Sequence, residues 1–293
     1  MELSIATQEA RVEIQKISSL PPFPSLATEL LNVLNDEDAD IDVIAEVIAK
    51  DAALTSRLIG LANSAFFSYE RKIYSIQDAM ICVLGVDLVK SLALTICLSG
   101  TFDYKRCERF DSLRYWVSCL MTTDLAMRLL PYIVIDDDYC IERDRLYLSG
   151  LLHNFGLLIL VERFPKLMNE VFEAAGENPE VDLIKSENRF VDYNHQEAGV
   201  WLATKWGLPE SLVTVMGEYQ NPNYRGKYWQ DAQLIGLSAR IVKTWLLDRE
   251  VDIETEKHSI EALQLSKKDL QRCMEKCHAT LEANKEMAAA LFI

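Results

Sequence analysis

The sequence predicts an all-α protein built as a multi-helix bundle. Over most of the chain, apolar residues recur every three to four positions, which is the period of an amphipathic helix. The 293 residues include only 11 Gly and 8 Pro, which argues against the many turns of a β-sandwich. No run alternates apolar and polar residues over strand length with hairpin turns beside it, so no sheet is required.

Helices in the first hundred residues have identifiable start and stop signals. Ser25 and Asp51 stand where N-caps belong, and Ser75 with Asp78 resembles a capping box. Gly85 is a stop signal between two apolar stretches. We expect helices over residues 26–34, 41–50, 52 to about 63, 75–84 and 86–99.

The middle of the chain continues in the same way. A long helix should stop before Pro131, and Asn194 with Glu197 forms a second capping-box pattern, for a helix that Gly207 ends. The stretch 145–161 is interpreted as one buried helix, because its most apolar part is only fifteen residues long and contains His153, too short and too polar for a bilayer span. We expect helices over residues 113–130, 145–161, 165–175, 181–190, 195–206 and 210–219.

The last segment predicts a helix over 229–247 and then one long helix that begins at Ser266. In that long helix the spacing of a heptad seam recurs at Leu270, Met274, Cys277, Leu281, Asn284, Ala288 and Leu291. Two alternatives follow: a homodimer through this C-terminal helix, or packing of the seam against the chain's own core. We favour the second, because Cys, Asn and Ala make a weak seam.

Composition and charge restrict the partners. With 30 Lys and Arg against 45 Asp and Glu, the formal charge of −15 repels nucleic acid and anionic membranes and favours a protein partner with a basic surface. The seven Cys are odd in number and form no Cys-x-x-Cys pair, as expected of reduced thiols in a cytoplasmic protein. No secretory signal is visible at the N-terminus, and no membrane association is predicted.

Two clusters of possible metal ligands carry little weight. The acidic run 136–138 lacks calcium-loop spacing and is interpreted as a solvated connector. Cys273, Cys277 and His278 share a helix, but no second pair of ligands at zinc spacing accompanies them. Helix packing is the preferred interpretation of these three residues.

Several ordered motifs together resemble one known family. They read Leu-Pro-Pro-Phe-Pro at 20–24, Ile-Ala-Lys-Asp-Ala-Ala-Leu at 48–54, Leu-Ala-Asn-Ser-Ala-Phe-Phe at 61–67, Gly-Leu-Leu-His-Asn-Phe-Gly at 150–156, His-Gln-Glu-Ala-Gly at 195–199 and Trp-Gly-Leu-Pro at 206–209. This order is similar to that of the HDOD family, a bacterial offshoot of the HD phosphohydrolases. The resemblance implies an all-helical HD-like fold (HDOD fold) in a signal-transduction or regulatory protein.

The resemblance also implies a domain organisation. Residues 1–16 are a lead-in, and 17–219 form the HDOD domain. That domain divides into an N-terminal helical bundle (17–110) and a pseudo-HD bundle (111–219). Residues 220–293 are a C-terminal helical extension.

Metal-binding residues of the HD family are replaced here. The adjacent His-Asp pair reads His153-Asn154, and an amide lacks the negative charge with which a carboxylate bridges two cations. Ser118 stands at the position where the family has an earlier His. Tyr219 stands where the family has the first residue of a His pair, and Ala239 where the family has a late Asp. Only His153 and His195 remain as ligands, fewer than the three of an open zinc site. We therefore expect no catalytic residue, no metal and no cofactor.

The expected function is a non-catalytic bacterial regulatory module that binds other proteins. His153, Asn154, His195, Ser118 and Tyr219 would line its vestigial HD pocket and satisfy one another's hydrogen bonds. A nucleotide or cyclic-dinucleotide sensor without turnover and a metal-dependent phosphohydrolase are the alternatives. Retained metal and turnover would indicate the phosphohydrolase, and saturable nucleotide binding without turnover the sensor.

Overall fold

The computed structural model describes residues 23–34, 36, 39–64, 67, 69–136, 139–177, 183–191 and 193–293, whose regular secondary structure is helical. The all-α prediction is confirmed, and no strand occurs in these ranges. The predicted lead-in 1–16, the prolines at 21 and 22, and acidic positions 137 and 138 lie outside them. None of the helices described is both long and apolar enough to cross a bilayer.

The first bundle contains α2 (Ser25–Leu34), α3 (Ile41–Ala49), α4 (Ala52–Ala62), α5 (Ile76–Asp78), the π-helical turn η1 (Ala79–Leu84) and α6 (Val86–Ser99). Local signals fix most of its boundaries. Asp51 accepts hydrogen bonds from the N–H groups of Ala53 and Leu54, and Ser75 accepts one from Asp78 N–H. Gly85 has a φ of 83°, which favours Gly, and the helical stretch ends there as predicted, although its last turn is π-helical.

The second bundle contains α7 (Ser112–Leu129), the 3₁₀ turn η2 (Leu130–Tyr132), α8 (Arg143–Leu152), α9 (Gly156–Arg163), α10 (Pro165–Glu177), α11 (Leu183–Phe190), α12 (His195–Lys205) and α13 (Glu210–Glu218). The single helix predicted over 145–161 is wrong. It is interrupted after Leu152, where Phe155 N–H donates to Leu152 O at 2.9 Å and Leu157 N–H to Asn154 O at 3.0 Å. These tighter i to i+3 bonds turn the chain, so that α9 leaves in a new direction.

The C-terminal segment contains α14 (Trp229–Leu246), the 3₁₀ turn η3 (Ile253–Glu256), α15 (Lys257–Ala262), α16 (Lys267–His278) and α17 (Leu281–Phe292). Ser266 caps α16 as predicted, but the single long helix after it is wrong. The chain breaks at Ala279 and Thr280, where the Thr280 hydroxyl makes hydrogen bonds with Cys277 O at 2.6 Å and with the Asp124 carboxylate on α7 at 3.1 Å. Helix α15 was not predicted.

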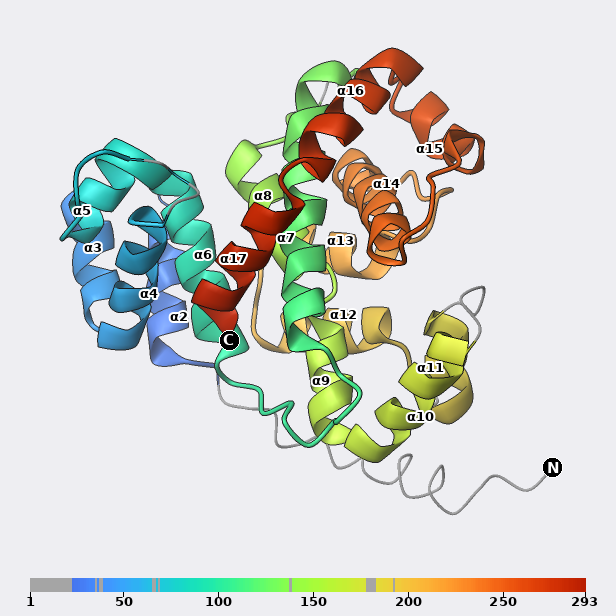
Figure 1. Cartoon of the computed structure of the whole chain (residues 1–293), viewed down its shortest axis with the longest axis horizontal. Helices are drawn as coiled ribbons and strands as arrows, with labels where there is room; N and C mark the ends of the chain where they lie inside the picture. Colours follow the sequence, from blue (N-terminus) through green and yellow to red (C-terminus); the bar gives the residue numbers. More distant parts are fainter. Residues whose placement is uncertain are drawn as a thin grey trace.

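The C-terminal seam is buried within the chain's own fold. Of the seven predicted seam positions, Leu270, Cys277, Asn284, Ala288 and Leu291 are buried. Helix α16 packs on α7, and α17 packs on α7, α4 and α6, so that it lies between the two bundles (Figure 1). The seam thus joins parts of one chain. Homodimerisation stays a prediction, and it would need a surface other than these residues.

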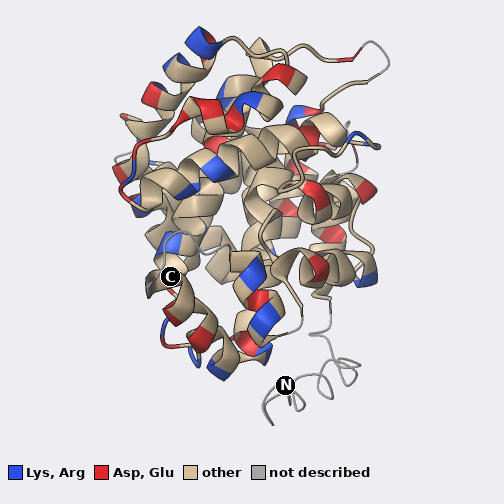
Figure 2. Ribbon diagram, turned by 90° about the vertical axis from the view of Figure 1, so that its right-hand side faces the viewer, with Lys and Arg blue, Asp and Glu red and all other residues tan. Residues whose placement is uncertain are grey.

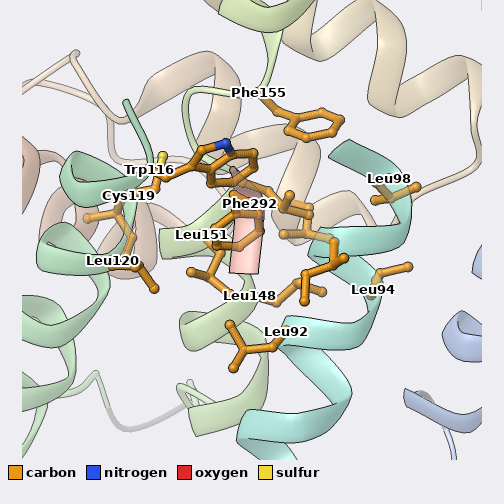
Figure 3. Close-up of a cluster of buried hydrophobic side chains, with 14 of the residues drawn as sticks. Leu92, Leu94, Leu98, Trp116, Cys119, Leu120, Leu148, Leu151, Phe155 and Phe292 are labelled. Atoms are coloured by element: carbon orange, nitrogen blue, oxygen red, sulfur yellow. The ribbon is translucent and has the colours of Figure 1, made fainter. Parts of the chain in front are cut away.

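The core runs continuously from one bundle to the other. Figure 3 shows Leu92, Leu94 and Leu98 of α6 in one cluster of buried side chains with Trp116 and Leu120 of α7. Side chains of α8 and Phe292 of α17 complete this cluster. Because burying one Leu or Phe side chain contributes about 1.5–3 kcal/mol, the cluster resists separation of the bundles.

Candidate functional site

His153 lies at the end of α8, where the chain turns toward α9. Its side chain is 4% exposed, and Nδ1 lies 2.7 Å from the carbonyl oxygen of Gly150. Burial lowers the pKa of His153 from 6.5 to about 4, and nearby His195 adds to this effect. The imidazole is therefore neutral at pH 7, with its proton on Nδ1 donated to Gly150 and Nε2 left as an acceptor.

His195 is the first residue of α12, and a capping box sets its position. Asn194 accepts a hydrogen bond from Glu197 N–H, while the Glu197 side chain accepts one from Asn194 N–H, as the sequence predicted. Both the backbone N–H and Nδ1 of His195 contact Oε2 of Glu187, at 3.0 and 2.7 Å. Two bonds to one carboxylate oxygen fix the orientation of the ring.

Tyr219 connects the two histidines. Its hydroxyl lies 2.8 Å from His195 Nε2, and its ring packs edge-on against that of His153 with centroids 4.9 Å apart. Gln220 donates from Nε2 to the Tyr219 hydroxyl at 2.7 Å. With Nδ1 of His195 donating to Glu187, the order of donation runs from Gln220 through Tyr219 and His195 to Glu187.

Close backbone contacts bring these residues together. A Cβ atom on Gly156 would lie 1.9 Å from the carbonyl oxygen of His195 and 2.4 Å from Gly199 N, so α9 meets the start of α12 only because residue 156 is Gly. In the same way, a Cβ on Gly236 of α14 would lie 1.8 Å from Tyr219 O. Two glycines thus set the positions of His195 and Tyr219.

The structure brings together three of the five predicted pocket residues: His153, His195 and Tyr219. The other two stand apart. The backbone carbonyl oxygen of Asn154 accepts a hydrogen bond from the Tyr115 hydroxyl at 3.2 Å. The side-chain Oδ1 of Asn154 is buried and has no hydrogen-bond partner in the described structure. Ser118 is half-buried on α7, and no hydrogen bond joins its hydroxyl to either histidine.

Sequence reasoning missed Glu187 and Gln220. Glu187 is fully buried on α11, and its second oxygen, Oε1, has no hydrogen-bond partner among the described residues. Nothing in its sequence neighbourhood marks it, because it lies in a polar, amphipathic helix where a Glu is normally solvated. Gln220 could have been found, since it follows Tyr219 directly. We call His153, Glu187, His195, Tyr219 and Gln220 the histidine cluster.

Potential metal ligands do not converge in the histidine cluster. Nε2 of His195 is already engaged by Tyr219, and Glu187 lies on the opposite side of that ring. Across the residues described, no three side chains of His, Cys, Asp or Glu are placed to hold one ion. The Cys273 and Cys277 thiols contact backbone carbonyls of α7, and His278 packs edge-on against Trp245, as expected of helix packing.

The fold is an all-helical, HD-like bundle in which His153 lies at the end of α8 and His195 begins the capped helix α12. Within the HD-like class, this chain belongs to the HDOD domain family, whose model matches residues 20–222.

Solved structures share the fold over nearly the whole chain. A Geobacter sulfurreducens HDOD domain protein of unknown function has a TM-score of 0.74 at 21% identity, covering 98% of each chain. A Shewanella amazonensis protein described provisionally as a phosphohydrolase has a TM-score of 0.74 at 22% identity, also over 98% of each chain. At these identities the likeness concerns the fold alone.

Two further relatives are longer than this chain. A Marinobacter aquaeolei protein described provisionally as a signal transduction protein has a TM-score of 0.83 at 21% identity, covering 98% of this chain and 66% of that one. An uncharacterized Treponema pallidum protein is 26% identical over 229 residues, which are 75% of this chain and 42% of the relative. This chain thus spans less than half of the Treponema protein.

Proposed function

We propose that this protein is a non-catalytic module of bacterial signal transduction that acts in the cytoplasm by binding other proteins. Its family and the provisional description of the Marinobacter relative support a signalling role. The proposal that the module is non-catalytic rests on the hydrogen bonding of His195. Nδ1 is held by Glu187 and Nε2 by Tyr219, so both ring nitrogens are engaged within the protein.

The chemistry of metal-assisted hydrolysis supports the same conclusion. A catalytic metal centre needs about three protein ligands and an open position for water or substrate. His153 offers one imidazole nitrogen, and Asn154, which replaces the Asp of the family motif, is a neutral amide. The cluster is thus more suited to holding helices α8, α11, α12 and α13 together than to activating water.

Metal content and turnover test this proposal. The full chain, purified without a metal-affinity tag, should contain well below one Mn, Fe, Mg or Zn ion per molecule. It should not hydrolyse a generic phosphodiester when Mn²⁺ is added. His153→Ala is the matched control. Stoichiometric metal and turnover that are both lost in His153→Ala would overturn the non-catalytic assignment. A defined protein that co-purifies with the wild-type chain would support the interaction role.

One observation favours a metal-dependent phosphohydrolase as a second candidate. A carboxylate that accepts from Nδ1 of a His, as Glu187 does from His195, is the usual support of a metal-ligating histidine. The Shewanella neighbour's provisional description points the same way. The metal analysis above separates this candidate from the first.

Unsatisfied buried oxygens favour a small-ligand sensor as a third candidate. Asn154 Oδ1 and Glu187 Oε1 both lack a partner in the described structure, and such atoms are the groups that a bound donor would satisfy. Calorimetric titration with cyclic dinucleotides tests this, with Tyr219→Phe as the variant. Saturable binding by the wild type and weaker binding by the variant would support the sensor.

A further inference from the structure

Four large apolar side chains are exposed on the N-terminal bundle: Val43 (48%), Tyr69 (42%), Tyr74 (74%) and Ile81 (66%). We call them the outer patch. Single exposed apolar residues are common on soluble proteins, but a gathering of several on one face marks a candidate interaction site.

Contacts between neighbouring elements bring together the segments that carry these residues. Helix α3 packs against α5, where Gln77 Nε2 lies 3.5 Å from the carboxylate of Asp42, the residue before Val43. Tyr69 lies against Cys82, which follows Ile81, and this contact raises the pKa of the Tyr69 hydroxyl. Figure 1 shows α3 and α5 at the edge of the bundle that lies away from α7. These two helices are therefore remote from α7.

The backbone beneath the outer patch is unusual. Ile81 and Cys82 are exposed residues of the π-helical turn η1, which closes through a hydrogen bond from Gly85 N–H to Met80 O at 3.1 Å. π-helical turns are rare and occur frequently at functional sites. Met80 and Leu84 of the same turn are buried, so the turn is anchored in the core while it presents Ile81 to solvent.

Carboxylates border the outer patch. Four exposed acids lie on its elements, namely Asp42, Glu46, Glu70 and Asp78, against two exposed cations, Arg71 and Lys72. The Lys72 ammonium lies over the Tyr74 ring, 5.6 Å from its centroid. Within the described part of the chain, no ion pair neutralises any of the four acids. Acidic side chains also recur on helices elsewhere in the molecule (Figure 2). The local surplus of negative charge matches a basic partner.

We propose that the outer patch binds a basic amphipathic helix of another protein, whose apolar stripe covers Tyr74 and Ile81 while its Lys and Arg residues face Asp42 and Glu46. An apolar stripe flanked by cations is a recurring form of helix recognition. This inference rests on the proposed function, because it assigns a surface to the module's protein partner.

A second copy of this chain fits the outer patch poorly. Among the described helices the most basic is α16, which carries Lys267, Lys268 and Lys276 at exposed positions. The apolar side of α16 is already used, because Leu270 and Cys277 are buried against α7. Helix α16 of a second copy therefore cannot supply the apolar stripe, and we assign the helix to a different protein.

Site-specific crosslinking tests the proposal in the full-length protein. A benzophenone amino acid replaces Tyr74 in the native cell, and the control places it at Val134, which is 49% exposed on the other bundle. We expect an adduct from position 74 alone, and the crosslinked peptide should come from a basic amphipathic helix. An adduct to a second copy or to an acidic segment, or no adduct above the control, would overturn the proposal.

The synthetic form of the crosslinked segment then serves as the probe in a binding titration. Ile81→Asp and Asp42→Lys should each weaken its binding about tenfold or more, and added salt should weaken it further. Leu113→Asp, at a residue 38% exposed on α7, should leave binding unchanged. Circular dichroism checks that each variant is folded. Equal binding by wild type and Ile81→Asp would contradict the assignment.

The outcomes separate this inference from the proposed function. If a defined protein co-purifies equally with wild type and Ile81→Asp, the interaction role stands and the outer patch is the wrong surface. If no protein co-purifies with the wild-type chain and the metal-dependent turnover is found instead, the proposed function fails, and this inference fails with it.

Discussion

The indole ring of Trp116 and the phenyl ring of Phe292 stack face to face, with centroids 3.8 Å apart and planes at 8°. Trp116 is fully buried on α7, and Phe292 is the last residue of α17. Beside this stack, Arg57 of α4 donates to Leu291 O at 2.8 Å. The end of the chain therefore joins the second bundle by stacking and the first by a hydrogen bond.

Truncating Phe292 should weaken the whole fold. Phe292→Ala removes the stacking partner of a buried Trp and leaves a cavity between the bundles, which should lower the free energy of unfolding by about 3–5 kcal/mol. Urea unfolding followed by circular dichroism measures this. Ile293→Ala is the control, since that side chain is 64% exposed and its loss should change stability by less than about 0.5 kcal/mol. Equal midpoints for Phe292→Ala and wild type would contradict the bridging role of α17.

Adding a single methyl group at Gly156 should disrupt the histidine cluster. Gly156→Ala places Cβ within 1.9 Å of His195 O, so α9 and α12 must move apart. We expect a loss of several kcal/mol in thermal or urea unfolding. Gly60→Ala is the matched control, because outside the backbone of its own helix no atom would lie within 4 Å of the new Cβ, and Ala is the better helix former by about 1 kcal/mol. A Gly156→Ala protein as stable as wild type would show that the two helices can separate freely.

Helix boundaries set by local chemistry were predictable from the sequence. Asp51, Asn194 and Ser266 each cap the helix that the sequence assigned to them. Two predictions were wrong, the single helix over 145–161 and the single long helix after Ser266, and both errors have a non-local cause. The turn after Leu152 accompanies the close approach of Gly156 to α12, and the break at Thr280 involves a hydrogen bond to Asp124 on α7. Both depend on residues far away in the sequence, which helical periodicity cannot register.

The candidate site was predictable only where a motif carried it. His153 and His195 were found because they stand in ordered family motifs, and Tyr219 because it stands where the family has a His. Glu187 was missed because its role depends on complete burial opposite His195, which the composition of α11 does not indicate. The motifs thus located the two histidines, but they did not reveal the carboxylate that accepts hydrogen bonds from His195.

Removing the Glu187 carboxylate should release His195. Glu187→Ala leaves the backbone N–H and Nδ1–H of His195 without their buried acceptor, which should cost about 3 kcal/mol. Glu187→Gln keeps one acceptor oxygen and should cost less. The exposed neighbour Lys185 gives a control, Lys185→Ala, that should be nearly neutral. In proton NMR, the downfield Nδ1–H resonance of His195 should disappear in Glu187→Ala. Its persistence there would mean that another group accepts this proton.

Acid should destabilise the fold partly through His153. Its pKa is lowered from 6.5 to about 4 in the folded protein, so below pH 6.5 the unfolded chain binds a proton that the folded chain does not. The stability that this provides is complete above pH 6.5 and is lost progressively toward pH 4, by about 2 kcal/mol at pH 5. Urea unfolding at pH 7.5 and pH 5 measures the loss. His153→Gln should show a correspondingly smaller loss over this range, whereas His258→Gln, at an exposed position, should behave as wild type. An unchanged loss in His153→Gln would mean that other groups cause the acid sensitivity.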